Sequence, residues 1–366
     1  MRKLIFVTII FIVSLSIGQV SAAPLRQEER ITIAVFFGET QNWIAPPFYL
    51  FWERNGGLPI FGYPLAPTSL LTSPDDGNTY ATQIFERNRL EYHPDNPEPY
   101  RIMLGRLGVE VLRQQGRNWE DFPKGKPTPG CDFFPETGHT LCEPFRTFWR
   151  SYGLDLGMPG TAMAESLALF GFPISEPSME TNAEGATVLT QWFERARFEY
   201  HPDNPPQYKV LLGLLGKELY GDYRPGVASV SGTAVVGWFE SEYYGLPFWE
   251  AVSTIGSNVN RASLWIRGPL YPPDHPLYSV PYANDWFSIL VDIQPDSTFN
   301  SASSGVLIPE VPGGIMEVKG GRIDGTCENG EKLTFHPFGS KEFQVTGGEP
   351  LENLEVFTTL LCGELF

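Results

Sequence analysis

The stretch that decides the fold occurs twice, as FERNRLEYHPDNP at Phe85–Pro97 and as FERARFEYHPDNP at Phe193–Pro205. Eleven of the thirteen letters are the same in both. Such a phrase either forms two active sites or belongs to one structural unit that the chain builds twice. Further matched pieces in a constant order favour the structural unit. We name the unit around the first phrase the first copy and the other the second copy.

Two matched pieces precede the phrase. Pro47–Gly56 (PFYLFWERNG) corresponds to Pro144–Gly153 (PFRTFWRSYG), and the aromatic residues in each lie three or four positions apart. This spacing predicts one face of a short helix, with Pro in its first turn and Gly at its end. FGYP at Phe61–Pro64 corresponds to FGFP at Phe170–Pro173, and Gly followed by an aromatic residue and Pro predicts a turn.

The phrase itself predicts a β-hairpin. In the first copy the strands are Gln83–Arg87 and Leu90–His93 around a turn at Asn88-Arg89, and the second copy has Ala196-Arg197 at the turn. Because residues two apart share one face of a strand, we expect a core side and a solvent side. The core side holds Phe85, Tyr92, Phe193 and Tyr200, and the solvent side holds Arg87, Glu91, Arg195 and Glu199.

Apolar residues at helical spacing predict a helix after each hairpin, within Tyr100–Leu112 and Tyr208–Tyr220. Glycine lowers the stability of a helix by about 1 kcal/mol relative to alanine. Glycines at matched positions therefore indicate that another backbone packs closely against these helices. They are Gly105, Gly108, Gly213 and Gly216.

This ordered set of pieces resembles the LGFP repeat of secreted and cell-surface bacterial proteins. The resemblance covers about residues 46–112 and 143–220, and it rests on the FW helix, the FGYP or FGFP turn and the aromatic hairpin. Arg89 and Arg197 stand where the family usually has a hairpin glycine. The resemblance implies a unit that attaches proteins to the cell envelope or binds its glycans, usually beside a catalytic domain and not as the catalyst.

The first residues predict export. Arg2 and Lys3 precede an apolar run over Leu4–Ile17, and VSA at 20–22 has the spacing of a signal-peptidase site. The run is short for a membrane span, which needs about 20 residues, and no second apolar span follows. Removal of residues 1–22 takes away two cations and no acids, so the formal charge changes from −17 to −19. A chain this acidic disfavours nucleic acid as a partner.

Four cysteines predict two disulfides in an oxidising compartment, with three possible connectivities. The pairs that are near in the sequence keep each bridge within one expected domain: Cys131 with Cys142, and Cys327 with Cys362. The sequence has neither a CxxC motif nor a histidine at ligand spacing from a cysteine, so thiol or metal chemistry is not indicated.

The glutamates of the phrase raise the alternative of a glycan hydrolase. Glu86 with Glu91, or Glu194 with Glu199, would supply the two acids that glycoside hydrolysis needs. Arginines alternate with them, however, and ion pairs across an exposed hairpin explain the same pattern. The sequence contains no GxSxG, HExxH or phosphate-loop motif. We therefore favour ion pairs over catalysis.

A histidine also lies in each phrase, at His93 and His201, two residues before an aspartate. A metal site would need more ligands than this pair supplies. The Asp-Asn-Pro that follows predicts a turn held by side-chain hydrogen bonds. No metal or other cofactor is indicated.

The chain after a Gly- and Pro-rich linker at 221–232 predicts an all-β sandwich or barrel, because six strands are separated by Gly and Pro turns. Alternation is clearest where Phe287, Ile289, Val291 and Ile293 share one face. The expected strands are Thr233–Glu240, Ala262–Gly268, Trp286–Gln294, Gly314–Gly320, Glu331–Phe338 and Leu354–Cys362.

A proline-rich loop between the second and third of these strands carries several aromatic rings. Rings on a stiff loop can stack on sugars or on a proline-rich peptide, whereas the alternative is that they pack over an open end of the sheet. The candidate binding residues are Tyr271, Tyr278, Tyr282 and Trp286, together with His93, His201, Trp52 and Trp149 of the copies.

The predicted fold class is α+β, with two small repeats of short helices and a β-hairpin followed by an all-β sandwich or barrel. The predicted function is a secreted or cell-surface, non-catalytic protein that binds cell-wall glycan or another envelope protein. A glycan hydrolase and a structural surface protein are the alternatives. The expected segments are a signal peptide (1–22), an N-terminal segment (23–45), the first copy (46–126), a Cys-bounded loop (127–142), the second copy (143–224) and a β-rich domain (225–366).

Overall fold

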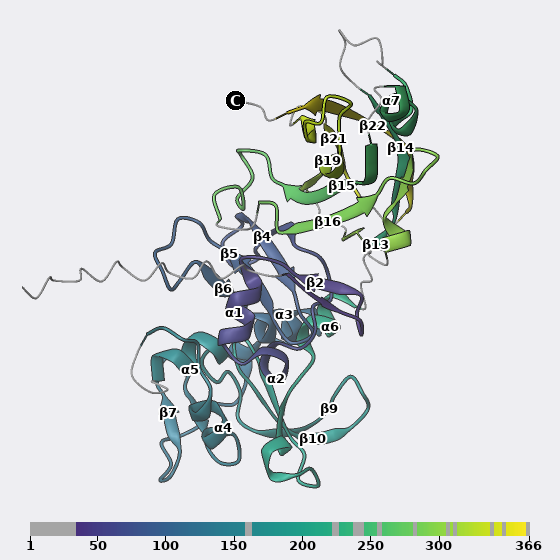
Figure 1. The fold of residues 1–366 in the computed structure, drawn as a ribbon. Helices are drawn as coiled ribbons and strands as arrows, with labels where there is room; N and C mark the ends of the chain where they lie inside the picture. Colours follow the sequence, from purple (N-terminus) through teal and green to yellow (C-terminus); the bar gives the residue numbers. More distant parts are fainter. Residues whose placement is uncertain are drawn as a thin grey trace, which may run out of the picture. The chain divides into compact units, whose positions relative to one another are not determined.

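The computed structural model describes residues 34–363, except 158–162, 222–226, 237–244, 255–257, 281–283, 305–307, 310–312, 337–339 and 346–348. The described residues all belong to one compact unit, Thr32–Phe366. They form a mixed, sheet-rich fold of short helices and mostly antiparallel strands (Figure 1). The expected signal peptide, part of the linker and Tyr282 lie outside the described residues. Among those residues, no helix has the length and apolar character needed to cross a membrane.

The first copy begins with two short helices and continues into a four-stranded sheet. Pro47, predicted in the first turn of the helix, lies one position before it as its N-cap. Gly62 of the FGYP turn has a φ of 78°, a backbone conformation that favours glycine. The elements are α1 (Phe48–Arg54), α2 (Gly57–Phe61), β3 (Ser69–Thr72), β4 (Thr79–Ile84), β5 (Arg89–Tyr92), β6 (Ile102–Leu104) and α3 (Leu107–Gln114), and the sheet order is β3-β4-β5-β6.

The second copy has the same order of two helices, four strands and a helix. Its sheet order is β12-β11-β10-β9, again with neighbours in the sequence paired. The elements are α4 (Phe145–Ser151), α5 (Met163–Phe170), β9 (Ser178–Thr181), β10 (Thr187–Trp192), β11 (Arg197–Tyr200), β12 (Val210–Leu212) and α6 (Leu215–Tyr220), with short 3-10 turns η1 (Trp119–Asp121) before it and η2 (Pro206–Tyr208) within it.

A small hairpin precedes each copy, and the two correspond. They are β1 (Val35–Phe37) with β2 (Asn42–Ile44), and β7 (Asp132–Phe134) with β8 (His139–Leu141). The duplication therefore extends beyond the expected copies to include 34–45 and 131–142. The sequence carries a signal for this match, because FFGET at Phe36–Thr40 corresponds to FFPET at Phe133–Thr137. Ala34 and Ala45 stand where the second hairpin has Cys131 and Cys142.

One buried glutamine fixes each hairpin to the sheet of its copy. Gln83 Nε2 donates to the carbonyl oxygen of Trp43 at 2.6 Å, and Gln191 Nε2 donates to that of Thr140 at 2.7 Å. Both glutamines are 0% exposed. Since a buried amide is unfavourable without hydrogen bonds, these contacts fix the position of each hairpin.

The turn of the repeated phrase lies earlier than predicted. It consists of Glu86 and Arg87, and Arg89 is already the first residue of β5. The backbone N–H groups of these two turn residues donate to the carbonyl oxygens of Tyr63 and Phe61, both at 3.0 Å. The FGYP turn thus holds the hairpin turn in place, and a hairpin glycine is not needed. The second copy has the same turn and the same pair of hydrogen bonds.

The segment predicted as one helix after each hairpin is a strand followed by a shorter helix. In the first copy, Leu104 ends β6 and α3 begins only at Leu107. The N–H group of Gly105 donates to the carbonyl oxygen of Arg89 at 3.0 Å, which keeps the chain beside β5 up to that point. Leu104 therefore lies on a strand, although the predicted helix included it. β12 and α6 divide the second copy in the same way.

The expected close contact with another backbone is confirmed at Gly108 and Gly216, whereas Gly105 and Gly213 precede the helices and lie against the side chains of Arg89 and Arg197. A Cβ atom at Gly108 would overlap the carbonyl oxygen of Phe193, and one at Gly216 would overlap that of Phe85. The N–H group of Val109 donates to the carbonyl oxygen of Glu194 at 3.2 Å. In the same way, the N–H group of Lys217 donates to the carbonyl oxygen of Glu86 at 3.1 Å. Each helix therefore packs on the hairpin turn of the other copy.

Aromatic side chains dominate the core of the copies. Phe85, Tyr92 and Phe193 are buried as predicted, whereas Tyr200 is half-buried. Burial of one large apolar side chain contributes about 1.5–3 kcal/mol, so these rings are a main source of stability.

The C-terminal region contains all six expected strands, with shifted ends. Two four-stranded sheets, β17-β14-β22-β20 and β16-β15-β19-β21, contribute side chains to one hydrophobic core. The strands are β14 (Val230–Val236), β15 (Asn258–Leu270), β16 (Phe287–Asp292), β17 (Thr298–Asn300), β19 (Ile315–Thr326), β20 (Leu333–His336), β21 (Ser340–Phe343) and β22 (Leu351–Cys362), with β13 (Val227–Ala228) paired to β18 (Ile308–Pro309), and with α7 (Phe248–Thr254) and η3 (Ser301–Ser304).

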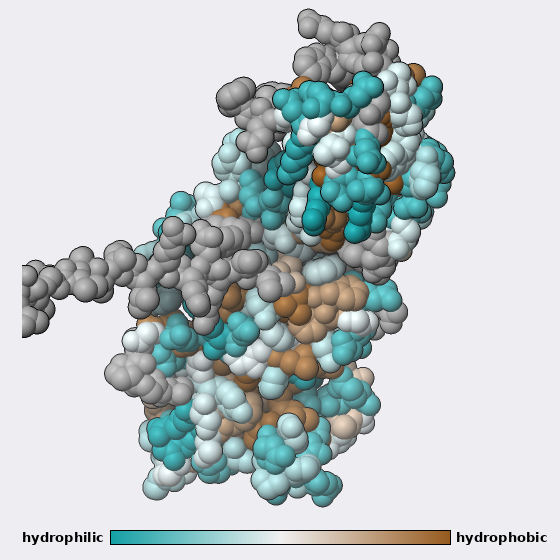
Figure 2. Space-filling view, in the orientation of Figure 1, coloured by the Kyte–Doolittle hydropathy of each residue, from teal (hydrophilic) through white to brown (hydrophobic). Residues whose placement is uncertain are grey.

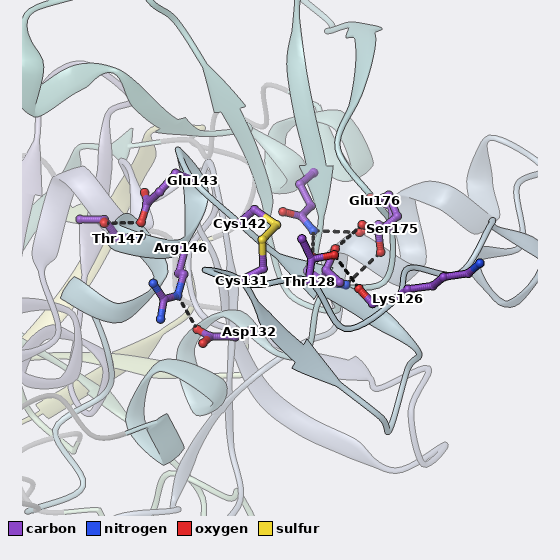
Figure 3. Close-up of a disulfide and its surroundings, with 12 residues drawn as sticks. Lys126, Thr128, Cys131, Asp132, Cys142, Glu143, Arg146, Thr147, Ser175 and Glu176 are labelled. Carbon is purple, nitrogen blue, oxygen red and sulfur yellow. Dashed lines mark hydrogen bonds and ion pairs between the residues drawn. A yellow bond between two sulfur atoms is a disulfide. The ribbon is translucent and has the colours of Figure 1, made fainter.

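Both expected disulfides are present, Cys131 with Cys142 and Cys327 with Cys362. Figure 3 shows the first, which links the two ends of the β7–β8 hairpin. Beside it, Asp132 accepts a hydrogen bond from Arg146 at 3.1 Å, so the hairpin is also tied to α4.

Candidate functional site

The two tryptophans predicted as binding residues support the fold of their own copies. The ring N–H of Trp52 donates to the carbonyl oxygen of Gly62 at 3.2 Å, and that of Trp149 donates to Gly171 at 3.4 Å. Each tryptophan therefore fixes the glycine turn of its copy. Trp149 is 0% exposed and has no free ring face for a ligand, whereas Trp52 is half-buried.

Glu91 lies in a buried charge network, and the prediction that it is solvated was wrong. The residue is 4% exposed. Arg89 donates to it through Nε at 2.8 Å, and the same guanidinium binds Glu110 of α3 at 2.8 Å and the hydroxyl of Tyr220 at 2.7 Å. Burial alone would lower the pKa of Arg89, but the pair with Glu110 raises it above its usual value. Helix α3 covers the face that alternation assigned to solvent.

The second copy has a matching network around Glu199, which is also 4% exposed, contrary to prediction. Arg197 binds Glu199 at 2.9 and 2.7 Å and Glu218 of α6 at 3.0 and 2.7 Å. Asn182 donates to the other oxygen of Glu199 at 2.8 Å. Removal of one partner from a buried pair is strongly destabilising, so this network fixes α6 to β11 within the second copy. In the first network, the hydrogen bond from Arg89 to Tyr220 also joins the two copies.

The remaining carboxylates of the hydrolase hypothesis are held by the turns. Glu86 accepts a hydrogen bond from the N–H group of Tyr63 at 3.0 Å, and Glu194 makes the matching contact at 3.1 Å. Arg87 and Arg195, also predicted to be solvated, have side chains only 22% and 20% exposed. Burial lowers the pKa of both arginines, and each donates to a carbonyl oxygen of the other copy at 3.3 Å.

The two histidines lie at the ends of these networks. Nε2 of His93 is 3.2 Å from Glu91, and Nε2 of His201 is 3.3 Å from Glu199. Tyr80 stacks on His93 with the ring centroids 3.7 Å apart. No group of three metal-ligating side chains occurs among the residues that the structure describes.

The aromatic residues of the proline-rich loop differ in exposure. Tyr271 is 4% exposed and stacks on His275, and burial raises the pKa of its hydroxyl. Trp286 is half-buried, whereas Tyr278 is 46% exposed. Tyr271 therefore follows the alternative interpretation, in which the ring fills space, and Tyr278 is the ring that a ligand can reach.

A hollow beside α1 is the best candidate for a ligand site. Its volume is about 310 Å³, at the lower end of the range of about 300–1,000 Å³ for small-molecule sites. Figure 2 shows hydrophobic residues at the surface among polar ones over the two copies. The floor of the hollow is apolar or aromatic, with Leu50, Phe51, Tyr92, Ile102 and Leu154. The exposed part of the lining is polar, with Arg54, Glu98 and Asp155 beside the half-buried Arg101, whereas Asn55 is only 7% exposed.

The rim of this hollow offers both charges and hydrogen bonds. Arg54 is exposed at the end of α1 and has no ion-pair partner among the described residues, and Arg101 lies 3.6 Å from Glu98. Burial raises the pKa of Tyr92, while Arg101 opposes the shift, so its hydroxyl is protonated at neutral pH. A ligand with polar edges and an apolar face would match this lining.

This hollow was missed from the sequence, although a signal exists. Asn55 accepts a hydrogen bond from the N–H group of Asp155 at 2.7 Å, so one wall comes from a segment distant in the sequence. Arg54 and Asn55 correspond to Ser151 and Tyr152 in the second copy. This difference between the copies at two adjoining positions is the sequence signal that indicates a site beside α1.

Comparison of the chain with models of known families, with curated proteins and with solved structures found no match. The resemblance to the LGFP repeat therefore stays a prediction.

Proposed function

We propose that this chain is a secreted or cell-surface protein that binds glycan of the cell envelope without catalysing a reaction. The observation that carries the proposal is the hollow beside α1, with apolar residues under a rim of arginine and carboxylate groups. A sugar unit has apolar ring faces and hydroxyl groups at its edges. Aromatic and apolar side chains suit the first, and the polar rim suits the second.

Export and the repeat architecture are part of the same proposal. The two disulfides support an oxidising compartment, where such bonds persist. The signal-peptide pattern of residues 1–22 and the resemblance to the LGFP repeat point to the cell envelope. In this proposal the two copies supply the glycan-binding part, and a β-sandwich or barrel follows them.

The glycan hydrolase receives less support. Hydrolysis needs two carboxyl groups that face the scissile bond. Glu91 and Glu199 are buried and bound by arginine instead.

A protein that binds another envelope protein is the stronger alternative, because apolar side chains are exposed at matched places in both copies. They are Leu70 (45%) with Met179 (63%), and Tyr100 (46%) with Tyr208 (55%).

The test is retention of the chain from residue 23 onward on purified cell wall and on protein-free wall glycan at moderate salt. We expect wild-type retention on both, and about tenfold weaker binding for Arg54→Ala, since loss of one good polar contact has that effect. Arg113→Ala is the matched control, because Arg113 is also exposed in the last turn of a helix, α3. No wild-type retention on glycan removes the proposal, and retention only on wall that still carries protein favours the protein-binding alternative.

A further inference from the structure

A second hollow, of about 490 Å³, lies on the sheet of the second copy. Its floor is the sheet face on which Arg197 lies, and the chain after α3 of the first copy forms one wall. The hollow therefore exists only because the two copies pack together. The lining residues that matter here are Gln115, Arg117, Ser178, Glu180, Asn182 and Trp192.

The corresponding face of the first copy has residues of another kind. By strand register, Leu71, Ser73 and Ile84 of the first copy correspond to Glu180, Asn182 and Trp192 of the second. In the first copy, Leu71 and Ile84 pack with Leu65 and Ala66 in a small apolar cluster. In the second copy, Trp192 is 1% exposed and also packs in an apolar cluster, with Ile174. The difference between the copies therefore lies at Glu180 and Asn182, which make this face polar.

The polar groups of the second hollow are held in place without a ligand. Arg117 donates to both oxygens of Glu180, at 3.0 and 2.9 Å, and Trp192 Nε1 donates to it at 3.0 Å. The guanidinium also lies 5.1 Å from the ring centroid of Phe122 and 5.7 Å from that of Trp192. Burial alone would raise the pKa of Glu180, but the hydrogen bond from Arg117 lowers it, so the carboxylate is ionised at neutral pH. Fixed side chains lose little entropy when a ligand binds.

Every charged side chain in the lining has a partner of opposite charge. Arg117 pairs with Glu180, and Arg197 pairs with Glu199 and Glu218. A charged ligand would have to compete with these pairs. A neutral ligand would not, because the paired Arg117 guanidinium uses only three of its N–H groups and can donate further hydrogen bonds.

We propose that the second hollow binds a neutral saccharide unit through its hydroxyl groups. This inference rests on the proposed function, since it names the class of sugar taken at one further place on a glycan-binding protein. The free N–H groups of Arg117 and the side-chain amides of Gln115 and Asn182 donate hydrogen bonds to the sugar hydroxyls. Glu180 already accepts hydrogen bonds from Arg117, Trp192 and Ser178, so it holds the guanidinium in place. The volume is within the range of about 300–1,000 Å³ for such ligands.

The test uses isothermal titration calorimetry with the chain from residue 23 onward. Cellobiose and N,N′-diacetylchitobiose are the neutral probes, and glucuronic acid is the charged probe. Asn182→Ser and Glu180→Leu each introduce the residue that the first copy has at the same place. We expect both to weaken neutral-probe binding about tenfold or more. The control is Glu184→Gln, an exposed residue in the turn of the same hairpin.

Each outcome decides the inference. Asn182 also donates to Glu199, so Gln115→Ala, which removes an exposed donor of the hollow and no contact of Glu180 or Glu199, provides the same test if circular dichroism shows that either variant does not fold. Binding of neither neutral probe, stronger binding of glucuronic acid, or neutral binding that Asn182→Ser leaves unchanged overturns the inference.

Retention on wall glycan separates this inference from the proposed function. Wild-type retention without neutral-probe binding means that the inference fails and the proposed function stands. Neutral-probe binding that Asn182→Ser weakens, without retention on glycan, means that the second hollow is a saccharide site and the proposed function fails.

Discussion

The two copies share their internal framework and differ in their hollows. In both, an arginine–glutamate pair is buried under a helix, a buried glutamine fixes the preceding hairpin, and a glycine allows a helix of one copy to contact the turn of the other. The hollows depend on residues that differ, such as Arg54 against Ser151 and Glu180 against Leu71. Matched residues therefore hold the fold, and binding is to be sought at unmatched ones.

The largest expected effect distinguishes the two tryptophans of the matched helices. Trp149→Ala removes a ring that is 0% exposed, and we expect a loss of about 3–5 kcal/mol of unfolding free energy. Trp52→Ala removes a half-buried ring and should cost about 2 kcal/mol, because folding removes a smaller area of this ring from water. Urea unfolding monitored by circular dichroism measures both. Equal losses would show that the copies are not packed differently at this helix.

The buried charge pairs should come next. Glu91→Gln and Glu199→Gln each remove one of the two carboxylates that bind a buried arginine. We expect losses of about 3 kcal/mol, the lower end of the range for a broken buried pair, because Glu110 or Glu218 still binds the arginine. Glu98→Gln is the control, because its side chain is 73% exposed and it lies 3.6 Å from Arg101, so its loss should stay within about 0.5 kcal/mol. Thermal unfolding compares the three variants. Losses as small as that of the control would show that Glu91 and Glu199 are exposed to solvent, as the sequence predicted.

The disulfide before the second copy gives a direct exchange between copies. Replacing Cys131 and Cys142 together by alanine introduces the residues that the first copy has at Ala34 and Ala45. Alanine fits the matching positions of the first copy, so we expect no added packing defect. The unfolding free energy should fall by about 2–3 kcal/mol, which is the contribution of closing this loop. Urea unfolding with and without a reductant measures it. The double variant should not respond to the reductant at this bridge, and an unchanged stability would mean that the bridge adds nothing to the hairpin.

The glycines between the copies should have a somewhat smaller effect. Gly108→Ala and Gly216→Ala each place a Cβ atom against a carbonyl oxygen of the other copy, and we expect losses of about 2 kcal/mol. Gly38→Ala is the control, because nothing lies within 4 Å of a Cβ atom there. Differential scanning calorimetry of the three variants tests the expected contact. If either helix variant matched the control, its helix would not lie on the other copy's turn.

The smallest expected effect concerns pH. Burial, and then Lys124, lower the pKa of His139, while Glu176 opposes them. The folded state therefore binds a proton less readily than the unfolded chain, whose histidine pKa is about 6.5. Stability should fall as the pH drops below about 6.5, and this loss should level off below the folded-state pKa. His139→Gln, measured by thermal unfolding across this window, should show a weaker pH dependence, and an unchanged profile would contradict the assignment.

Those parts of the fold that local patterns determine could be predicted from the sequence. Alternation gave the C-terminal strands, and aromatic spacing gave α1 and α4. The hairpin turn was misplaced because its position depends on the carbonyl oxygens of Phe61 and Tyr63, which bind it from another piece of the chain. The match between the two small hairpins could have been predicted, because FFGET at Phe36–Thr40 and FFPET at Phe133–Thr137 share four of five letters. It was missed because the predicted copies began only at the helix that follows each hairpin.

The candidate sites were less predictable. Alternation assigns Glu91 to one face of β5, but it cannot show that Glu110 and Tyr220 cover that face. The hollow beside α1 brings Arg54 close to Asp155, and no local pattern connects the two. Tyr271 and Tyr278 both lie in the proline-rich loop, and the local sequence does not distinguish them. Tertiary packing makes Tyr271 buried and leaves Tyr278 exposed.

The most direct measurement is retention on protein-free wall glycan of Glu91→Gln beside Arg54→Ala, at a temperature where circular dichroism shows both variants to be folded. We expect Glu91→Gln to be retained like the wild type, because Glu91 holds the framework. Arg54→Ala should bind about tenfold more weakly, because Arg54 lines the hollow beside α1. A folded Glu91→Gln that is not retained, together with an Arg54→Ala that is retained in full, would contradict this and make the repeated phrase the binding site.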